Sequence, residues 1–267
     1  MSFDDEALDL EAVFTEPPRP PTPEPTTAIY TRDEANIHSE EDWKELKIRL
    51  VGSHPLWAHH LWNAAIALAT FLDANAELYR GRHVLELGAG GALPSLVTAN
   101  NGAAKVVVTD YPDKSLVDNM KHNMSENVKE ELIGRVDIQG YIWGHAVEPL
   151  LDALPPDSRS HKFHLVILSD LIFSHSQHDA LLKTCELVLS DKTPTNVLEP
   201  CVLVFYTHHR PHLAHRDMEF FSKAREAGWT CEEILQKKFL PMFPEDSGEE
   251  SIRSTVHGWK LTRRNEQ

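Results

Sequence analysis

Residues 83–96 read H-V-L-E-L-G-A-G-G-A-L-P-S-L, an apolar run that stops at glycines and then continues into a second apolar segment. The first run is typical of a short buried strand, and the segment 93–101 is typical of a helix. A glycine-bearing turn from strand to helix is where a doubly wound α/β fold binds its ligand. Gly88 and Gly90 have no Cβ atom, so the backbone there can adopt positive φ and approach a ligand closely.

A carboxylate follows at the distance that a nucleoside site requires. The β-branched run K-V-V-V-T over 105–109 predicts the next strand, and Asp110 ends it about 20 residues after the turn, where it can accept hydrogen bonds from both hydroxyls of a ribose. A dinucleotide fingerprint needs a third glycine at the position of Leu93. Glu86 would repel a pyrophosphate but suits a ligand with an ammonium group. These features favour S-adenosylmethionine, which has a ribose, a sulfonium and an amino acid end, but no phosphate.

The remaining apolar patterns alternate between strand and helix. Strands are predicted over 136–142, 163–168 and 201–206, and helices over 61–72, 115–127, 179–189 and 217–227, with a short helix near Pro149. Such alternation predicts a parallel sheet covered on both faces. Two final extended stretches, 230–240 and 251–261, are joined by a loop too short for a crossover, so they must pair antiparallel. We expect an α/β fold: a Rossmann-like, doubly wound sheet of seven strands, mostly parallel, with a C-terminal antiparallel hairpin.

Composition limits the domain organisation and the partners. Residues 1–28 are acidic and proline-rich and are predicted to form a disordered tail, while 29–267 form one domain. The net charge of −15 disfavours nucleic acid and suits a basic protein partner, or serves solubility alone. The three cysteines form no C-x-x-C pair, which fits a reducing compartment. The chain starts without a signal-peptide pattern, and its longest apolar stretch, 56–72, contains polar residues; we expect a cytoplasmic protein without a membrane span.

Several motifs together resemble a known family. E-L-G-A-G and V-T-D are similar to the seven-stranded S-adenosylmethionine-dependent methyltransferases. P-L-W-A-H-H-L-W-N-A-A, Y-I-W-G and L-S-D-L-I-F-S-H-S-Q-H resemble the protein lysine methyltransferase branch. With Y-T-H-H-R-P added, the resemblance is to the fungal protein N-terminal and lysine methyltransferases of translation elongation factor 1-alpha, and it covers about residues 45–262. One departure is Ala92, where the superfamily pattern has glycine; either the turn is reshaped, or the glycine has shifted to Gly91.

The resemblance implies roles for individual residues. Trp62 would wall the cofactor, and Gly88, Ala89 and Gly90 would hold its methionine part. Asp110 would bind the ribose. Trp143 would lie against the adenine, and Ser169 would close the pocket through its backbone. Ordinary core packing is the alternative for both tryptophans.

Asp170, in L-S-D-L-I-F, is the predicted catalytic residue. In the superfamily, enzymes acting on nucleic-acid bases or glutamine amides carry [DN]-P-P-[YFW] here, so its absence also disfavours a nucleic-acid base as acceptor. Only a neutral amine has a lone pair for attack, and burial lowers an amine's pKa whereas a carboxylate favours the ammonium. We therefore expect Asp170 to orient the amine first and accept its proton second, with Phe173 offering an aromatic face. The alternative for Asp170 is a helix N-cap.

Two histidine clusters remain: His175 with His178, and a second set comprising His208, His209, His212 and His215. His175 and His178 are three residues apart, whereas the helical metal-binding pair of H-E-x-x-H is four apart. Methyl transfer from a sulfonium needs no metal. We expect no metal site, with some of these histidines lining the acceptor channel and the rest on the solvated surface.

The sequence thus predicts a monomeric enzyme that moves methyl groups from S-adenosyl-L-methionine to a protein amine. By resemblance, its basic protein substrate is elongation factor 1-alpha, at the N-terminal amine and an adjacent lysine. Three alternatives are an N-methyltransferase acting on nicotinamide or a related pyridine, a non-catalytic binding module, and a nicotinamide-dinucleotide oxidoreductase. The last is disfavoured by Leu93 and by the terminal hairpin.

Overall fold

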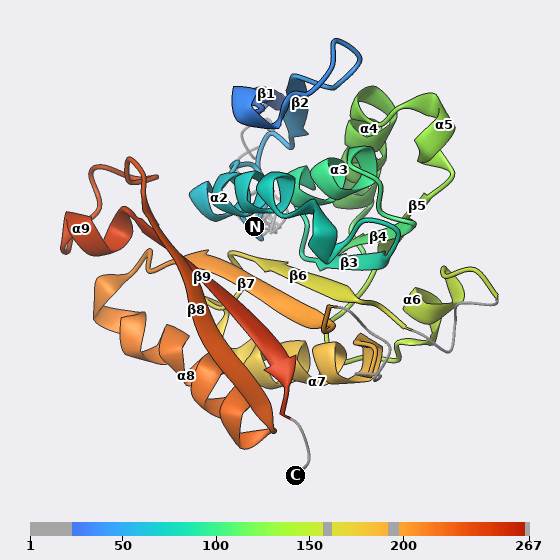
Figure 1. Ribbon diagram of the computed structural model, residues 1–267. Helices are drawn as coiled ribbons and strands as arrows, with labels where there is room; N and C mark the ends of the chain where they lie inside the picture. The colour runs from blue at the N-terminus through green and yellow to red at the C-terminus, as the bar shows by residue number, and fades with distance from the viewer. Residues whose placement is uncertain (1–22, 157–161, 192–197, 265–267) are drawn as a thin grey trace, which may run out of the picture.

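The computed structural model describes residues 23–156, 162–191 and 198–264 (Figure 1). Most of the predicted tail therefore lies outside the described residues, but its predicted end at residue 28 is wrong. Strand β1 (Thr26–Thr31) begins inside it, because these residues pair antiparallel with β2 (Glu45–Leu50). No helix in the described part of the chain has the length and apolar character needed to cross a membrane.

A seven-stranded sheet carries the fold, in the order β5-β4-β3-β6-β7-β9-β8 (Figure 1). Its strands are β3 (His83–Leu87), β4 (Lys105–Asp110), β5 (Val136–Gly140), β6 (Leu165–Ser169), β7 (Cys201–Thr207), β8 (Trp229–Lys238) and β9 (Thr255–Arg263). The first five are parallel, and β9 pairs antiparallel with both β7 and β8. The predicted sheet and its terminal hairpin are confirmed, with β9 placed between β7 and β8.

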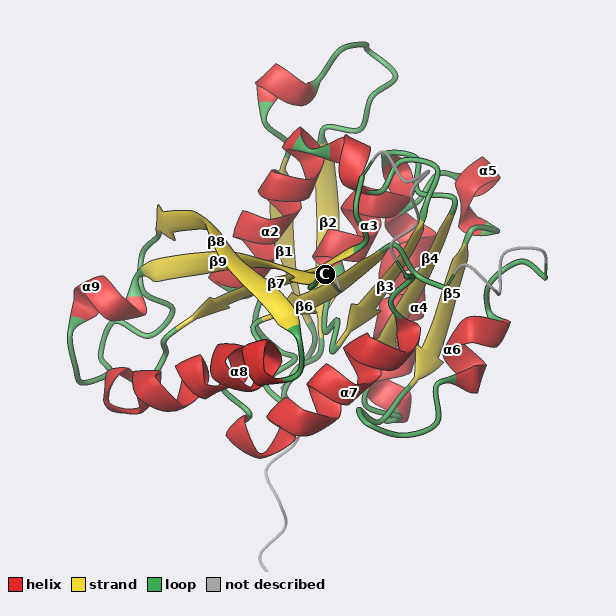
Figure 2. Cartoon of the chain, turned by 60° about the horizontal axis from the view of Figure 1, so that its bottom comes forward, coloured by secondary structure: helices red, strands yellow, loops and turns green. Residues whose placement is uncertain are grey.

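Helices cover both faces of this sheet (Figures 1 and 2). One layer consists of α2 (Asn63–Ala74), α3 (Leu93–Asn100) and α4 (Lys114–Asn127), followed by the short α5 (Glu130–Ile133). The other consists of α6 (Glu148–Asp152), α7 (His178–Val188) and α8 (Ala214–Glu226). Short helical turns are η1 (Glu34–Asn36), η2 (Ala76–Leu78), η4 (His175–Gln177), η5 (Pro211–Leu213) and α9 (Glu250–Arg253).

Strand residues alternate between two hydrophobic clusters, one beneath each helical layer. On β3, Val84 packs with residues of α2, α3 and α4, whereas Leu85 and Leu87 pack with residues of α6, α7 and α8. On β4, Val106 belongs to the first of these clusters and Val107 to the second. Because both faces are covered, these strands are mostly apolar, as the sequence predicted for a parallel sheet.

Element boundaries differ from the predicted ones where short-range patterns compete. Helix α2 begins at Asn63 rather than at 61, so Trp62 is its N-cap residue with extended backbone instead of a helical residue. Strand β5 ends at Gly140, which places Trp143 in the loop beyond it. The start of the last predicted strand, from 251, instead forms α9, and β9 begins at Thr255.

The β1–β2 hairpin was not predicted, and it packs on the layer of α2, α3 and α4. Its inward side chains join the core there: Tyr30, Leu46, Ile48 and Leu50. The edge of β2 is covered by side-chain amides of α4. Asn123 accepts from the Arg49 amide at 2.8 Å and donates to the Arg49 carbonyl at 2.9 Å, and Asn127 bonds Lys47 in the same way at 2.7 and 2.9 Å. These amides satisfy backbone groups that an edge strand otherwise leaves unpaired.

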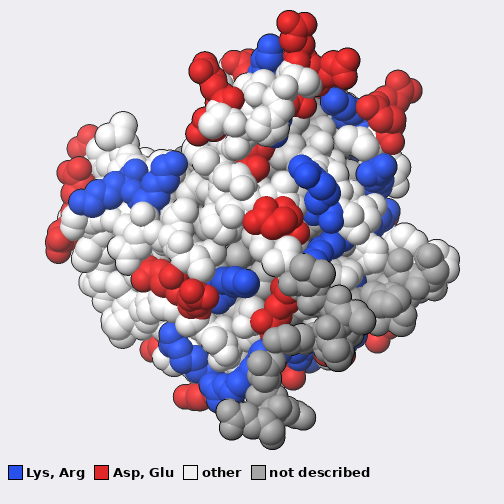
Figure 3. All heavy atoms as spheres, viewed as in Figure 1, with Lys and Arg blue, Asp and Glu red and all other residues white. Residues whose placement is uncertain are grey.

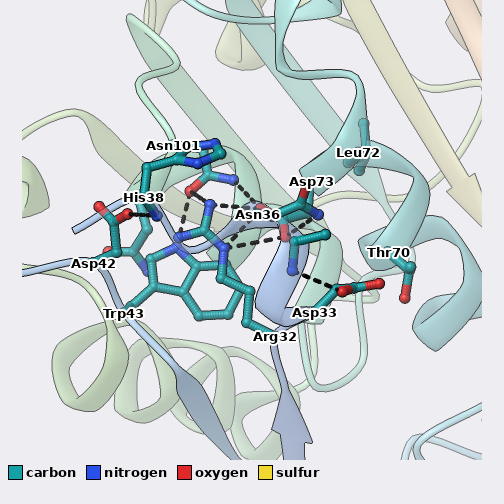
Figure 4. A network of polar contacts seen from close by, with 12 residues as sticks. Arg32, Asp33, Asn36, His38, Asp42, Trp43, Thr70, Leu72, Asp73 and Asn101 are labelled. Carbon is teal, nitrogen blue, oxygen red and sulfur yellow. Dashed lines mark hydrogen bonds and ion pairs between the residues drawn. The ribbon is translucent and has the colours of Figure 1, made fainter. Parts of the chain in front are cut away.

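A buried ion pair anchors the same hairpin (Figure 4). Arg32, just after β1, places Nη2 2.8 Å from Oδ1 of Asp73 on α2, and the two side chains are 9% and 1% exposed. Asn36 and Asn101 donate to the same carboxylate at 2.8 and 2.7 Å, and the guanidinium lies over the Trp43 ring at 4.5 Å. The carboxylate is well bonded, whereas loss of one partner would leave a buried charge uncompensated.

Candidate functional site

The carboxyl ends of the parallel strands border a cavity of about 470 Å³, a size typical of small-molecule sites. Its walls come from the turn after β3, the ends of β4 and β6, the loop after β5 and the segment before α2. All eight predicted site residues line it: Trp62, Gly88, Ala89, Gly90, Asp110, Trp143, Ser169 and Asp170. The structure therefore brings residues from five parts of the chain to one cavity.

The glycine turn after β3 leaves room beside this cavity. Gly88 and Gly90 have φ values of 62° and 53°, which L side chains rarely adopt. A Cβ atom on Gly88 would lie 2.6 Å from Cδ2 of Leu171 and 3.1 Å from the Trp143 ring, so packing excludes a side chain there. A Cβ on Gly90 would meet no atom within 4 Å. Gly90 thus leaves space for a ligand to approach the backbone.

Ala92 stands where the superfamily pattern has glycine, and it adopts the conformation that glycine favours. Its φ of 61° and ψ of 28° are left-handed, which costs a residue with a Cβ roughly 1–2 kcal/mol. Gly91 has no positive φ, and a Cβ there would lie 2.6 Å from Cγ2 of Ile48 on the hairpin. The glycine has therefore not shifted. Ala92 itself adopts the strained left-handed conformation, and Gly91 allows the hairpin to pack.

Asp110 ends β4 with its carboxylate held by the backbone. Its Oδ2 accepts from the Gly90 amide and its Oδ1 from the Tyr111 amide, both at 2.7 Å. Burial raises the pKa of Asp110 above its usual value, although these two hydrogen bonds act in the opposite direction. Each carboxylate oxygen can accept a further bond. The orientation is fixed by the protein, and the capacity to bind a diol remains.

Glu86 is directed away from the cavity. Its Oε2 accepts from the Ser95 amide at 3.0 Å and from the Ser95 hydroxyl, in the first turn of α3. Its Oε1 has no hydrogen-bond partner among the described residues. The side chain is fully buried, and burial raises its pKa to about 8 despite the bonds to Ser95. Glu86 therefore stabilises the start of α3 rather than lining the cavity.

Asp170 follows β6 with a left-handed φ of 57° and is 5% exposed. Its amide donates to the Phe205 carbonyl at 2.7 Å, which ties it to β7. Its Oδ1 accepts from the Thr207 amide at 3.3 Å, and its Oδ2 lies 2.9 Å from Nε2 of His209. The helix-cap alternative is wrong, because the next helical turn begins only after Ser174 and its cap makes no side-chain bond. The carboxylate instead joins the ends of two neighbouring strands at the cavity wall.

His209 is the site residue that sequence reasoning did not single out. Its ring lies edge-on to Trp62 with centroids 4.8 Å apart, and its Nε2 contacts Asp170. It therefore touches two side chains that line the cavity. Burial alone would lower the pKa of His209, but the Asp170 and Asp217 carboxylates together raise it above the ordinary value. Adjacent parallel strands end side by side. A carboxylate after β6 and a histidine after β7 could therefore have predicted the contact between Asp170 and His209.

The other histidines of the two clusters lie outside the cavity wall. His208 and His175 both contact Asp217 of α8, at 2.6 and 2.7 Å, and His178 bonds a backbone carbonyl at 2.6 Å. None of these three lines the cavity, and the remaining two, His212 and His215, are exposed. Within the described residues, no group of three or more His, Cys, Asp and Glu side chains is arranged to hold a metal ion.

The charges of the cavity wall select for a class of ligand. Its carboxylates are Asp110 and Asp170, and no described residue of the lining is Lys or Arg. A phosphate would meet no cationic side chain there, whereas a sulfonium or ammonium would be attracted. Ser169 adds a buried hydroxyl without a hydrogen-bond partner among the described residues. These two carboxylates and the hydroxyl fit a nucleoside that carries a positive charge and ribose hydroxyls. S-adenosylmethionine is such a ligand.

Comparison with known proteins agrees with this geometry. A family model described as lysine methyltransferase matches residues 40–227. Protein N-terminal and lysine N-methyltransferase EFM7 from Cryptococcus neoformans is 46% identical, and the match covers 95% of this chain and 88% of that protein. The protein of the same name from Schizosaccharomyces pombe is 44% identical over 94% of each chain. The one from Candida glabrata is 42% identical over 98% of this chain and 99% of the relative.

Solved structures show the same fold at low sequence identity. A structure described as a transferase from Pyrococcus horikoshii has a TM-score of 0.51 at 13% identity, covering 90% of this chain and 73% of that one. A structure described as a SAM-dependent methyltransferase from Streptococcus mutans has a TM-score of 0.50 at 12% identity, covering 81% and 53%. With the family match over most of its domain and relatives similar over nearly its whole length, the chain belongs to the lysine methyltransferase family.

Proposed function

We propose that this chain transfers methyl groups from S-adenosylmethionine to a protein amine, namely the N-terminal amine and an adjacent lysine of elongation factor 1-alpha. The observation that carries the proposal is the order of groups along one cavity. Because β3 lies between β4 and β6, the glycine turn separates Asp110 from Asp170. A ribose site, a methionine site and an acceptor site thus follow one another across three adjacent strands.

Each lining residue has a place in this arrangement. The open space at Gly90 suits the methionine part along the turn Gly88-Ala89-Gly90. Asp110 suits the ribose hydroxyls, because the Gly90 amide fixes its Oδ2, the Tyr111 amide fixes its Oδ1, and both oxygens keep acceptor capacity. Trp143 would lie against the adenine, and Trp62 would cover the cofactor beside α2, with Ser169 contributing backbone at the end of β6. Trp62 and Trp143 both line the cavity, which favours a ligand-binding role over packing alone.

The acceptor must be a neutral amine when its nitrogen attacks the methyl group. When bound, S-adenosylmethionine supplies an electrophilic methyl group on a sulfonium. Asp170 would accept a hydrogen bond from the amine and direct its lone pair, and Phe173, which also lines the cavity, would offer an aromatic face. The apolar surroundings lower the amine's pKa and so increase the neutral fraction.

A protein acceptor is favoured over a small pyridine by two observations. The relatives that match nearly the whole chain are named as protein methyltransferases. The net charge is −15, and Figure 3 shows acidic side chains gathered around the β1–β2 connection, where Asp33, Glu34, Glu40 and Glu41 are exposed. Such a surface attracts a basic protein.

We also infer that the protein acts as a monomer in the cytoplasm. Cys185, Cys201 and Cys231 are all unpaired thiols, as is usual in a reducing compartment.

Labelling with S-adenosylmethionine that carries a tritiated methyl group tests the acceptor. The chain is incubated in parallel with elongation factor 1-alpha and with nicotinamide. We expect label in the protein, which mass spectrometry should place on the N-terminal amine and the adjacent lysine. Label in nicotinamide alone would contradict the proposal and favour a small-molecule enzyme.

Replacing the carboxylate at the acceptor end tests the role of Asp170. We expect Asp170→Ala to lower the methylation rate at least about 100-fold, the range lost with a positioned polar catalytic group. Calorimetric affinity for S-adenosylmethionine should stay within about twofold, because Asp110 and the glycine turn are untouched. Asp179→Ala, at an exposed position of α7, is the matched control. Full activity of Asp170→Ala in a folded chain would remove Asp170 from the mechanism.

A further inference from the structure

We propose that His209 is a positioning residue for methyl transfer: it holds the Asp170 carboxylate in place and offsets its negative charge. Asp170 can then orient the incoming amine without keeping that amine protonated. The inference rests on the proposed function, because it concerns the amine acceptor of the same cavity.

The proposed chemistry contains a conflict that His209 resolves. A lysine side chain has a pKa of about 10.4 and an α-amine about 8, and only the deprotonated form can attack. An unpaired carboxylate beside the amine would raise the amine's pKa further, typically by 1–3 units for a close pair of opposite charges. Asp170 is 5% exposed, so water screens its charge poorly. A cation on the far side of the carboxylate acts on the amine in the opposite direction and so offsets this effect.

The geometry places His209 on the far side. Its Nε2 lies 2.9 Å from Oδ2 of Asp170. Among the described residues, Oδ1 accepts only the long 3.3 Å bond from the Thr207 amide and keeps acceptor capacity. His209 does not itself line the cavity, whereas Asp170 does. The carboxylate therefore stands between the imidazole and the acceptor site.

The loop after β7 is fixed in a way that makes this pairing rigid. The His209 amide donates to the Thr207 carbonyl at 2.9 Å, and its ring is held against Trp62. On either side, His208 bonds Asp217, and Arg210 donates to the Phe173 carbonyl at 3.2 Å. All three basic side chains of H-H-R thus tie this loop to the segment after β6 or to α8.

The surrounding charges favour an imidazolium. The groups that act on His209 are Asp170 after β6, Asp217 on α8 and Arg210 on its own loop. Burial and Arg210 lower the pKa of His209, while the two carboxylates raise it, and the net direction is upward. His209 is thus a cation over a wider range of pH than a free histidine. In this arrangement the acceptor ammonium gives its proton to water before the nitrogen attacks, and His209 keeps its own proton throughout.

The test is the pH dependence of single-turnover methylation of an N-terminal peptide of elongation factor 1-alpha. We expect His209→Gln, which has no charge to offer, to move the acid limb of the rate upward by about one pH unit, because the amine is then harder to deprotonate. Calorimetric affinity for S-adenosylmethionine should not change. His212→Gln, at an exposed position of the same region, should leave the profile unchanged. In an Asp170→Asn background, His209→Gln should no longer shift the limb.

A readout without turnover separates this inference from the proposed function. Imidazole titration followed by NMR in the free protein should give His209 a pKa above that of a free histidine, and Asp170→Asn should lower it. An identical titration in both proteins overturns the inference even if methylation is normal. A His209→Gln rate that falls equally at every pH also overturns it, since His209 is then only a structural support. No methylation of any amine by the unsubstituted chain would contradict the proposed function, and the titration would still decide whether the pair is coupled.

Discussion

Glu86 places a carboxyl group in the middle of an apolar strand, and its titration should dominate part of the stability profile. Its pKa is raised to about 8 from an ordinary 4.5. Between these values the folded chain holds a proton that the unfolded chain has lost, so the free energy of unfolding falls as pH rises through this window. We expect Glu86→Gln to flatten that fall, which amounts to several kcal/mol at about 1.36 kcal/mol per pKa unit.

Urea unfolding at intervals from about pH 5 to about pH 8 measures the effect. The slope with pH is the diagnostic quantity, because an amide at this position also changes the absolute stability by a constant amount. Glu131→Gln, at an exposed position, should run parallel to the unsubstituted chain. If Glu86→Gln does so as well, the buried carboxyl is not protonated in the folded state.

Single residues also show how far the site could be predicted. Asp110 and Asp170 were identifiable because each lies at the carboxyl end of a strand, and both line the cavity. The bond between Asp170 and His209 joins residues 39 positions apart in sequence, and only the pairing of β6 with β7 brings them together. Ala92 was recognised as a departure from the pattern, but its left-handed backbone depends on packing that composition does not encode.

Among the elements, α4 links the hairpin to the glycine turn through one side chain. Asn123, which is fully buried, bonds both backbone groups of Arg49 and donates to the Gly91 carbonyl at 3.0 Å. We expect Asn123→Ala to lower the free energy of unfolding by about 2–4 kcal/mol, because it leaves several buried polar groups without a hydrogen-bond partner. It should also weaken binding of S-adenosylmethionine about tenfold, equivalent to 1.4 kcal/mol.

Asn127 provides the matched comparison for this experiment. It bonds Lys47 in the same pattern but is only half-buried and does not reach the turn. Asn127→Ala should cost about 1 kcal/mol in urea unfolding and leave calorimetric ligand affinity unchanged. Equal losses of affinity in both variants would show that the hairpin as a whole, rather than Asn123, supports the turn.

Elements were predictable where a local pattern is strong. Strands β3 and β4 are mostly apolar because helices cover both faces, and glycine or a polar residue marks their ends. The β1–β2 hairpin was missed, although E-L-K-I-R-L over Glu45–Leu50 alternates as a half-buried strand should. Its partner strand is mostly exposed, and the groups that cover its edge lie on α4, some 70 to 80 residues later.

For the whole molecule, the cavity joins parts of the chain that pack into different cores. Its lining includes Leu93 from the cluster beneath α2, α3 and α4, and Leu171 from the cluster beneath α6, α7 and α8. A ligand there should stabilise the fold as a unit. At a concentration of 100 times its Kd, S-adenosylmethionine should increase the free energy of unfolding by about 2.7 kcal/mol. The same ligand concentration should raise Tm by roughly 5–10 °C.

Thermal unfolding with and without the ligand measures this shift. Asp110→Asn should abolish most of it, because the amide presents a donor where backbone N–H groups and ribose hydroxyls require acceptors. Asp118→Asn, at an exposed position of α4, should retain it. An equal rise in Tm for Asp110→Asn would mean that the ribose is bound elsewhere.

The position of β9 has a consequence for biosynthesis. It is the last described strand along the chain, yet it is inserted between β7 and β8. Because translation releases the N-terminal part first, β7 and β8 leave the ribosome before the strand that must separate them. Until then β7 exposes an unpaired edge that β8 or another nascent chain could occupy. The sheet can be completed only after β9 has been synthesised, so a ribosome that pauses before β9 carries a product whose β7 edge is unpaired and prone to aggregation.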